Sequence, residues 1–213
     1  HAGAYNIVST SAQAVENGSY KLKGCNIVDL ILGLERNDGH SLVPYKALPT
    51  NLYKALKPFT SKGGHVLASG AYIASDCRDR IYDFTPDAKM RKDEIEPEVI
   101  FTEEVLKYTW ITNKGSNNGT AKIVQSPYKF EAGRSINFYN KPNQGSYCVE
   151  SPDALAPARD AFTIMRYGDS GLSAAIAYRS MDYRCVCIGF PIETITSQND
   201  INTLMKEAVN FLK

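Results

Sequence analysis

Ser69 and Gly70 end an apolar run that begins at His65, and a helix is predicted to begin near Tyr72. A strand, a sharp turn and a helix form the layout of a nucleophile elbow, which holds a side chain ready for attack. A serine hydroxyl needs a base, and His40 is the candidate because its loop is expected at the same edge of the sheet. The residues therefore suggest a Ser69–His40 hydrolase, with a small serine packed under a helix as the simpler alternative.

Carboxylates follow the predicted core strands at three places. Asp76 comes about one helical turn after the elbow, whereas Glu35 and Glu193 follow the ends of other strands. The carboxyl ends of strands in an α/β sheet meet at the edge where ligands bind. Asp residues near helix starts commonly accept backbone N–H bonds, so Asp76 has capping as an alternative role. We expect one ligand pocket lined by Glu35, Ser69, Gly70, Tyr72, Asp76 and Glu193.

Two further motifs could carry hydrolytic chemistry. Gly168-Asp-Ser-Gly171 matches the start of the nucleophile motif of chymotrypsin-like proteases, but Leu172-Ser173 replaces the Gly-Pro that usually follows. The same four residues are typical of a turn between strands. The acidic pairs Asp93-Glu94 and Glu103-Glu104 could act as glycosidase carboxylates or could simply face solvent, because the sequence does not fix their separation.

The cysteines and histidines predict no metal site and no cofactor. The five cysteines form no CxxC pair, and no Cys or His pair has the spacing of a structural zinc site. We expect them to be free thiols packed as small hydrophobic side chains. Thirteen tyrosines against one tryptophan offer apolar faces with polar tips, which suit a carbohydrate or peptide ligand, although half-buried tyrosines on sheet faces are the commoner case.

Composition narrows the class of protein. The chain has 213 residues, of which 43% are hydrophobic and 22% charged, and its formal net charge is +1. It can bury a full core, and it has no electrostatic footprint for nucleic acid. No apolar run reaches the roughly 18 to 20 residues that span a bilayer. The first convincing core strand begins only at Asn26, so we expect that the N-terminal part of the fold is missing from this chain.

Hydrophobic periodicity predicts an α/β core. Buried strands are expected at Asn26–Leu32, His65–Ser69 and Arg184–Phe190, because each is an apolar run that ends in a turn signal. Amphipathic helices are expected from Lys46 or Thr50 to Ser61 and over Asp200–Lys213. We predict that the three strands lie in one sheet with their carboxyl ends together.

Between these segments, from about residue 100 to 180, the pattern changes to short alternating strands. Glu104–Thr112 and Thr120–Gln125 are expected to form a hairpin around residues 113–119. Further strands are expected at Ser135–Tyr139, Phe162–Tyr167 and Ser173–Arg179. These segments predict an antiparallel β extension on the core, within a single domain over residues 1–213.

Three blocks in a fixed order carry a family resemblance: residues 26–35, 63–76 and 186–194. Together with Val8-Ser9, Ala14–Gly18 and Phe190-Pro-Ile-Glu193, this order resembles the glutamine-amidotransferase-like domain of secreted Bacteroidetes proteins described as xanthan-lyase-like. The resemblance implies a flavodoxin-like three-layer α/β fold and an exported, periplasmic or cell-surface location.

The same resemblance implies that amidotransferase chemistry has been lost. The elbow positions that would hold the nucleophile are Ser69, Gly70 or Ala71, and Pro191 stands where a catalytic histidine would follow the last core strand. Without a thiolate and its base no glutaminase activity is expected, and Cys77 lies too far into the helix to replace them.

Two hypotheses of function follow. The first is a non-catalytic domain of an exported, polysaccharide-associated protein, which binds a carbohydrate ligand or a neighbouring domain at the carboxyl edge of its sheet. The second is a hydrolase or lyase for polysaccharide or ester substrates that uses Ser69, Asp76 or Glu193.

Overall fold

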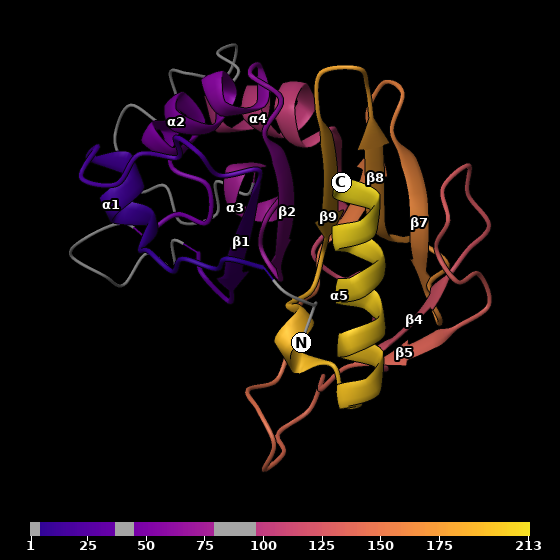
Figure 1. Ribbon diagram of the computed structural model, residues 1–213. Helices are drawn as coiled ribbons and strands as arrows, with labels where there is room; N and C mark the ends of the chain where they lie inside the picture. Colours follow the sequence, from indigo (N-terminus) through magenta and orange to yellow (C-terminus); the bar gives the residue numbers. More distant parts are fainter. Residues whose placement is uncertain (1–4, 37–44, 79–96) are drawn as a thin grey trace.

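The computed structural model describes residues 5–36, 45–78 and 97–213. Strands dominate these residues, and the helices are few and mostly short (Figure 1). In chain order the elements are α1 (Ala12–Glu16), β1 (Ile27–Gly33), α2 (Thr50–Thr60), β2 (His65–Gly70), α3 (Ser75–Arg78), α4 (Pro97–Phe101), the π-helical turn η3 (Thr102–Leu106), β3 (Tyr108–Thr112), β4 (Thr120–Ile123), β5 (Ser135–Asn137), β6 (Ala154–Pro157), β7 (Phe162–Tyr167), β8 (Ser173–Arg179), β9 (Arg184–Ile188), the short 3-10 helix η4 (Ile192–Thr194) and α5 (Gln198–Leu212).

Seven strands form one mixed sheet in the order β1-β2-β9-β8-β7-β4-β5. The three apolar runs predicted as core strands are β1, β2 and β9, and they are parallel neighbours, with Leu30 beside Ala68 and Ala68 beside Cys187. This confirms that they share one sheet with their carboxyl ends together. The remaining pairs, β9 with β8, β8 with β7, β7 with β4 and β4 with β5, are all antiparallel.

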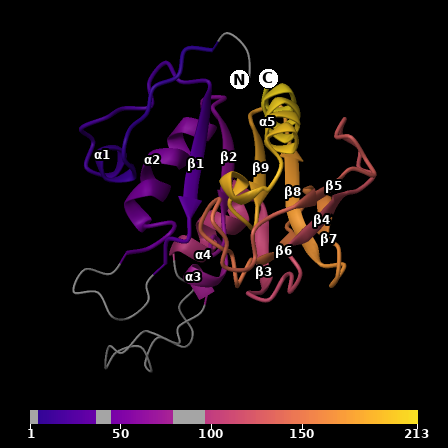
Figure 2. The same ribbon diagram turned by 90° about the horizontal axis from the view of Figure 1, so that it is seen from below.

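The predicted flavodoxin-like, three-layer α/β fold is wrong. The sheet is mostly antiparallel and curls into a half-barrel with few helices, rather than lying flat between two helical layers (Figure 2). The physical reason is the connection lengths. Short turns join β7 to β8 and β8 to β9, and such turns can only give antiparallel neighbours. The segment predicted as an extension is therefore continuous with the core, because β8 hydrogen-bonds to β9 directly.

The predicted hairpin around residues 113–119 is also wrong. Residues 102–106 form the π-helical turn η3, and Lys107 ends it in the left-handed conformation, with φ 64°. β3 then pairs with β6 in a separate two-stranded sheet, while β4 joins the large sheet. Strand alternation predicts that a segment is extended, but it does not select the partner strand. The helix expected near Tyr72 begins at Ser75, after a turn over residues 71–74.

Hydrophobic cores cover the two faces of the sheet. On one face α5 packs through Leu204, Ala208 and Leu212, as its amphipathic pattern predicts. On the other face α2, α4 and η3 pack through Leu52, Leu56, Phe101 and Leu106. Among the described residues, none of the helices combines the length and the apolar character that crossing a membrane requires.

Candidate functional site

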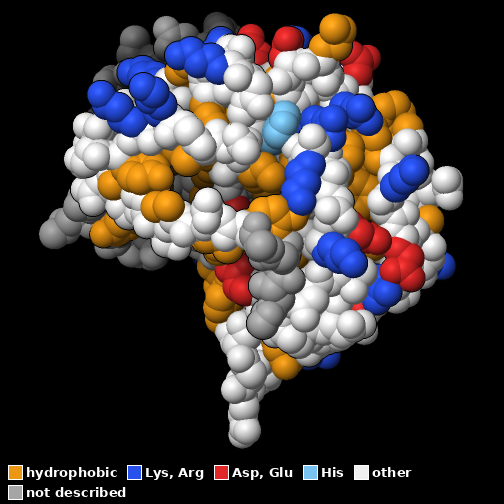
Figure 3. All heavy atoms as spheres, viewed as in Figure 1, with side chains coloured by type: hydrophobic (Ala, Val, Ile, Leu, Met, Phe, Trp, Pro, Cys, Tyr) orange, Lys and Arg blue, Asp and Glu red, His pale blue; other side chains and the backbone are white. Residues whose placement is uncertain are grey.

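The carboxyl ends of β1, β2 and β9 meet at one edge of the sheet. Gly33 at the end of β1 lies beside Gly70 at the end of β2, and the N–H of Ala71 donates to the carbonyl of Gly33 at 2.9 Å. The chain leaves β9 through Pro191 into η4, which carries Glu193. Figure 3 shows that the molecule is hollowed below β1, with acidic and hydrophobic side chains around the hollow.

Tyr147 and Glu193 form a hydrogen-bonded pair against this edge. The Tyr147 hydroxyl donates to Oε1 of Glu193 at 2.6 Å, although the two residues are far apart in the chain. A Cβ at Gly33 would lie 3.3 Å from the Tyr147 hydroxyl and 3.9 Å from Oε1 of Glu193, so glycine lets the pair approach β1 closely. Burial and the Glu193 carboxylate raise the pKa of Tyr147, so its hydroxyl keeps its proton. The tyrosine is nevertheless 40% exposed.

Arg36 and Tyr72 form a second contact at the same edge. The guanidinium carbon of Arg36 lies 4.4 Å from the centre of the Tyr72 ring, a cation–π distance. Glu35 is exposed as a residue, but protein atoms surround part of its carboxyl group. This partial desolvation, followed by the nearby carboxylates of Asp76 and Glu16, raises the pKa of Glu35. Asp76 accepts the N–H of Ala47 at 2.9 Å, which fixes the chain before α2. Five of the six predicted pocket residues thus gather at this edge, namely Glu35, Gly70, Tyr72, Asp76 and Glu193.

Ser69 does not present its hydroxyl to a ligand, because the residue is only 1% exposed. Of the histidines, His1 and His40 lie outside the described residues. His65 lies at the other end of β2, about 13 Å from Ser69 at 3.3 Å per residue, and its Nδ1 accepts the N–H of Arg184 at 3.1 Å. Cys77 is mostly surrounded by protein, and desolvation raises the pKa of its thiol. The described part of the chain therefore offers Ser69 no histidine base.

Asp153 organises the elbow from a distant part of the chain, and no pattern in the sequence indicates this role. Its Oδ2 accepts the N–H groups of Ala74 and Ser75, both at 2.8 Å, where α3 begins. Its own N–H donates to the carbonyls of Ala71 and Gly189, which joins the exits of β2 and β9. The residue is completely buried, and this burial raises its pKa to about 7. The two residues that its side chain binds, Ala74 and Ser75, lie 79 and 78 positions away in the chain, so no local motif marks Asp153.

Asp29 is a second residue at this edge that no sequence motif indicates. It lies on β1 and is exposed as a residue, yet many atoms surround its carboxyl group. Desolvation, and after it the Glu193 carboxylate, raise the pKa of Asp29 to about 6. Because side chains alternate along a strand, the sequence could have predicted that Asp29 lies on the face of β1 opposite to Leu30 and Leu32. It could not have predicted that Asp29 lies near Glu193.

The other candidate motifs have structural roles. In the turn between β7 and β8, the Ser170 hydroxyl donates to the carbonyl of Gly115 at 2.5 Å, and Asp169 accepts the N–H of Asn117 at 2.7 Å. Gly171 adopts φ 68°, as tight turns require. Asp93-Glu94 lies outside the described residues. The Gly-Asp-Ser-Gly tetrad therefore serves a turn.

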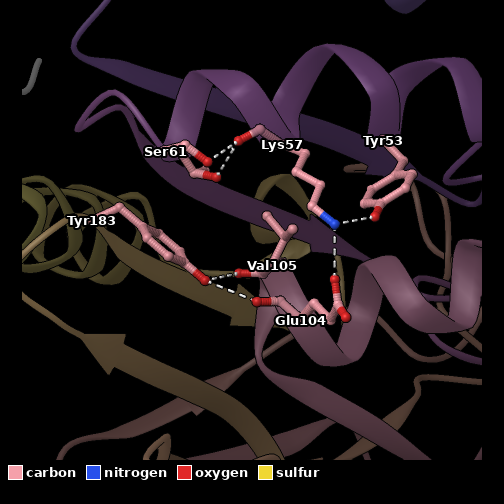
Figure 4. Close-up of polar contacts among 7 residues, drawn as sticks. Tyr53, Lys57, Ser61, Glu104, Val105 and Tyr183 are labelled. Atoms are coloured by element: carbon pink, nitrogen blue, oxygen red, sulfur yellow. Dashed lines mark hydrogen bonds and ion pairs between the residues drawn. The ribbon is translucent and has the colours of Figure 1, made fainter.

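Glu104 of the second acidic pair ties α2 to η3 (Figure 4). Its Oε2 accepts a bond of 3.0 Å from Nζ of Lys57, which also donates to the Tyr53 hydroxyl at 2.8 Å. The Tyr183 hydroxyl donates to the carbonyls of Glu104 and Val105 at 3.1 and 2.9 Å. These bonds fix the π-helical turn against its neighbours.

The five cysteines are free thiols. Within residues 5–36, 45–78 and 97–213, no three His, Cys, Asp or Glu side chains are grouped so that they could hold a metal ion.

No protein-family model matches this chain, and no curated protein sequence matches it. Among solved structures the chain is similar to the "mmIFT52 N-terminal domain", with a TM-score of 0.52 and 10% identity over 95% of this chain and 80% of that one. It also matches the exo-beta-1,4-mannosidase Op5Man5 from Opitutaceae bacterium strain TAV5, at TM-score 0.45 and 9% identity, over 89% of this chain and 25% of that one. The first likeness concerns the fold alone. With the sheet topology, it corrects the flavodoxin-like, glutamine-amidotransferase-like and xanthan-lyase-like description to a mostly β half-barrel.

Proposed function

We propose that this chain binds a carbohydrate at the carboxyl edge of β1, β2 and β9 without transforming it. The observation that carries the proposal is the Tyr147–Glu193 pair, which combines a partly exposed aromatic ring with an oriented carboxylate. Sugars present C–H faces that pack on aromatic rings and hydroxyls that bond to carboxylates.

The surroundings of the pair fit a preformed site. Gly33 and Gly70 keep the strand ends free of side chains, and the Arg36–Tyr72 contact supplies a second aromatic ring and a cation. The Tyr147 hydroxyl is already oriented by Glu193 at 2.6 Å, so little conformational freedom remains to be lost when a ligand binds. The burial of Ser69 argues against a serine nucleophile.

A second candidate function, hydrolysis by two carboxylates, is favoured by one observation. Desolvation, and after it the Glu193 carboxylate, raise the pKa of Asp29 to about 6, so this carboxyl group holds its proton to a higher pH than an ordinary aspartate does. A carboxyl group with a raised pKa beside a second carboxylate is typical of acid–base sites. The two candidate functions differ in one measurable property, the release of product.

The test is calorimetric titration of the full chain with a panel of neutral and acidic oligosaccharides. We expect saturable binding to at least one of them, weakened about tenfold or more in Tyr147→Phe, because a hydrogen bond to a charged group contributes about 1.5 kcal/mol or more. Tyr5→Phe is the matched control, since Tyr5 contacts Lys213 at the end of α5.

Product analysis by mass spectrometry accompanies each titration. Saturable binding with the sugar recovered intact supports the proposal. Cleavage of the bound sugar that disappears in Glu193→Gln would favour the hydrolase, and no binding across the panel would overturn both candidates.

A further inference from the structure

β1 is an edge strand with one free side. Within the described part of the chain it pairs only with β2. The His65 N–H donates to the carbonyl of Asn26, so the backbone groups of Asn26 and of every second residue after it face β2. The N–H and C=O groups of Ile27, Asp29 and Ile31 therefore point away from the sheet. A row of such groups is a template for another strand.

One face of this edge also carries exposed side chains. Val28, Leu30 and Leu32 pack toward α2 on one face of β1, whereas Asp29 is exposed and Ile31 is 68% exposed on the other. Helix α5 packs against β9 and β2, to one side of β1 (Figure 1). The edge thus combines unpaired backbone groups with an apolar side chain that a partner could bury.

The charges near this edge indicate which kind of strand could pair with it. Asp29 and Glu193 lie near each other beside Ile31, and no described cation forms an ion pair with Asp29. A second copy paired to this edge would bring two sets of these carboxylates together along one short ladder, and like charges on paired strands destabilise them. A strand with basic side chains on the same face would instead be attracted.

We infer that the β1 edge binds an extended basic peptide, which adds an eighth strand to the sheet. Main-chain hydrogen bonds to Ile27, Asp29 and Ile31 supply the affinity. Lys or Arg side chains on the face of Asp29 and Ile31, which pair with the carboxylate and cover the isoleucine with their aliphatic stems, supply the selectivity. This site uses the backbone of β1 and is separate from the Tyr147 hydroxyl of the proposed carbohydrate site.

The probe is an acetylated, amidated octapeptide of alternating lysine and valine, titrated into the full chain and followed by calorimetry. We expect Asp29→Asn to weaken binding about two- to fivefold, as for loss of one cross-strand ion pair, and Asp29→Lys to weaken it further. Asp182→Asn, an exposed change in the turn between β8 and β9, is the matched control and leaves binding unchanged. A glutamate–valine peptide of the same pattern is not bound.

N-methylated peptides test the strand itself. Methylation of every second amide, in either of two frames, removes only the N–H groups on one side of the peptide. If the peptide pairs with β1, methylation in one frame abolishes binding and methylation in the other frame preserves it. Equal binding of the two methylated peptides would overturn the inference, and so would unchanged peptide binding in Asp29→Lys. Sedimentation that shows a dimer lost in Asp29→Lys would assign the edge to a second copy and also overturn it.

The carbohydrate site and the peptide site can be tested independently of each other. Tyr147→Phe is expected to weaken carbohydrate binding and to leave peptide binding unchanged. Asp29→Lys, checked for an unaltered far-ultraviolet circular dichroism spectrum, tests the peptide site by itself. Loss of both ligands in a folded Tyr147→Phe would show that the sites are not separate.

Discussion

At the scale of single residues, Asp153 is a carboxyl group held where water cannot reach it. Its Oδ2 accepts two backbone N–H groups, while its Oδ1 has no hydrogen-bond partner and is buried. The two N–H bonds favour the charged form, but desolvation outweighs them and raises the pKa to about 7. The group is thus a source of pH-dependent stability at the elbow.

The sign of that dependence follows from the raised pKa. An unfolded Asp titrates near 3.9, so between about pH 4 and pH 7 the folded protein binds more protons than the unfolded chain. The contribution of Asp153 to the free energy of unfolding is therefore fully present below about pH 4 and is lost as the pH rises through about 7. The full loss is on the order of 4 kcal/mol.

Asp153→Asn removes this titration and keeps an oxygen for the N–H groups of Ala74 and Ser75. We expect the difference in unfolding free energy between the variant and the parent to shift in favour of the variant between pH 5 and pH 8, measured by urea denaturation. A difference that stays constant across this range would show that Asp153 keeps an ordinary pKa.

At the scale of elements, the exit of β2 depends on the absence of a side chain at Gly70. A Cβ there would lie 2.8 Å from Cγ2 of Ile73 and 2.9 Å from Cβ of Leu32. This agrees with the tight turn that the sequence predicts at the end of the strand. Such contacts are closer than packed carbon atoms allow, so a larger residue must displace the turn or β1.

Gly70→Val is therefore expected to lower the free energy of unfolding by about 1 to 3 kcal/mol, the usual cost of overpacking. Chemical denaturation monitored by circular dichroism measures it. Lys122→Val, which places the same side chain on the exposed face of β4, should cost much less. Equal midpoints for Gly70→Val and the parent would contradict the crowding at this turn.

At the scale of the whole molecule, one curled sheet carries both hydrophobic cores. Leu56 belongs to the core under α2, and Leu204 belongs to the core under α5. The strands β2 and β9 contribute side chains to both cores, with Leu67 and Val186 on one face and Val66 and Cys185 on the other. Loss of either core therefore exposes the shared strands, and the two cores should unfold together.

Leu56→Ala and Leu204→Ala are each expected to destabilise by about 2 to 5 kcal/mol and to lower a single transition. Fluorescence of Trp110, the one tryptophan, reports the α2 side, and far-ultraviolet circular dichroism reports the whole chain. Coincident midpoints in both variants are the expected result. Separate midpoints in Leu204→Ala would mean that the two cores unfold independently.

The local sequence pattern was sufficient to predict those features that depend on residues close together in the chain. The apolar runs of β1, β2 and β9 identified three strands and their common sheet. Burial on both faces requires the continuous hydrophobic runs of β2 and β9, whereas β1 is buried on one face only. The amphipathic spacing of α2 and α5 identified both helices. The turn after Ser69 placed Gly70 at a crowded position.

Tertiary structure alone decided what depends on pairing across the chain. Alternation marks β3, β4 and β8 as strands but does not choose their partners, so the antiparallel half-barrel replaced the expected three-layer fold. The Asp153 cap, the Tyr147–Glu193 pair and the raised pKa of Asp29 join residues separated by 46 positions or more. Such contacts form only when the sheet closes, because burial and distance set their energies and neither is written in the local sequence.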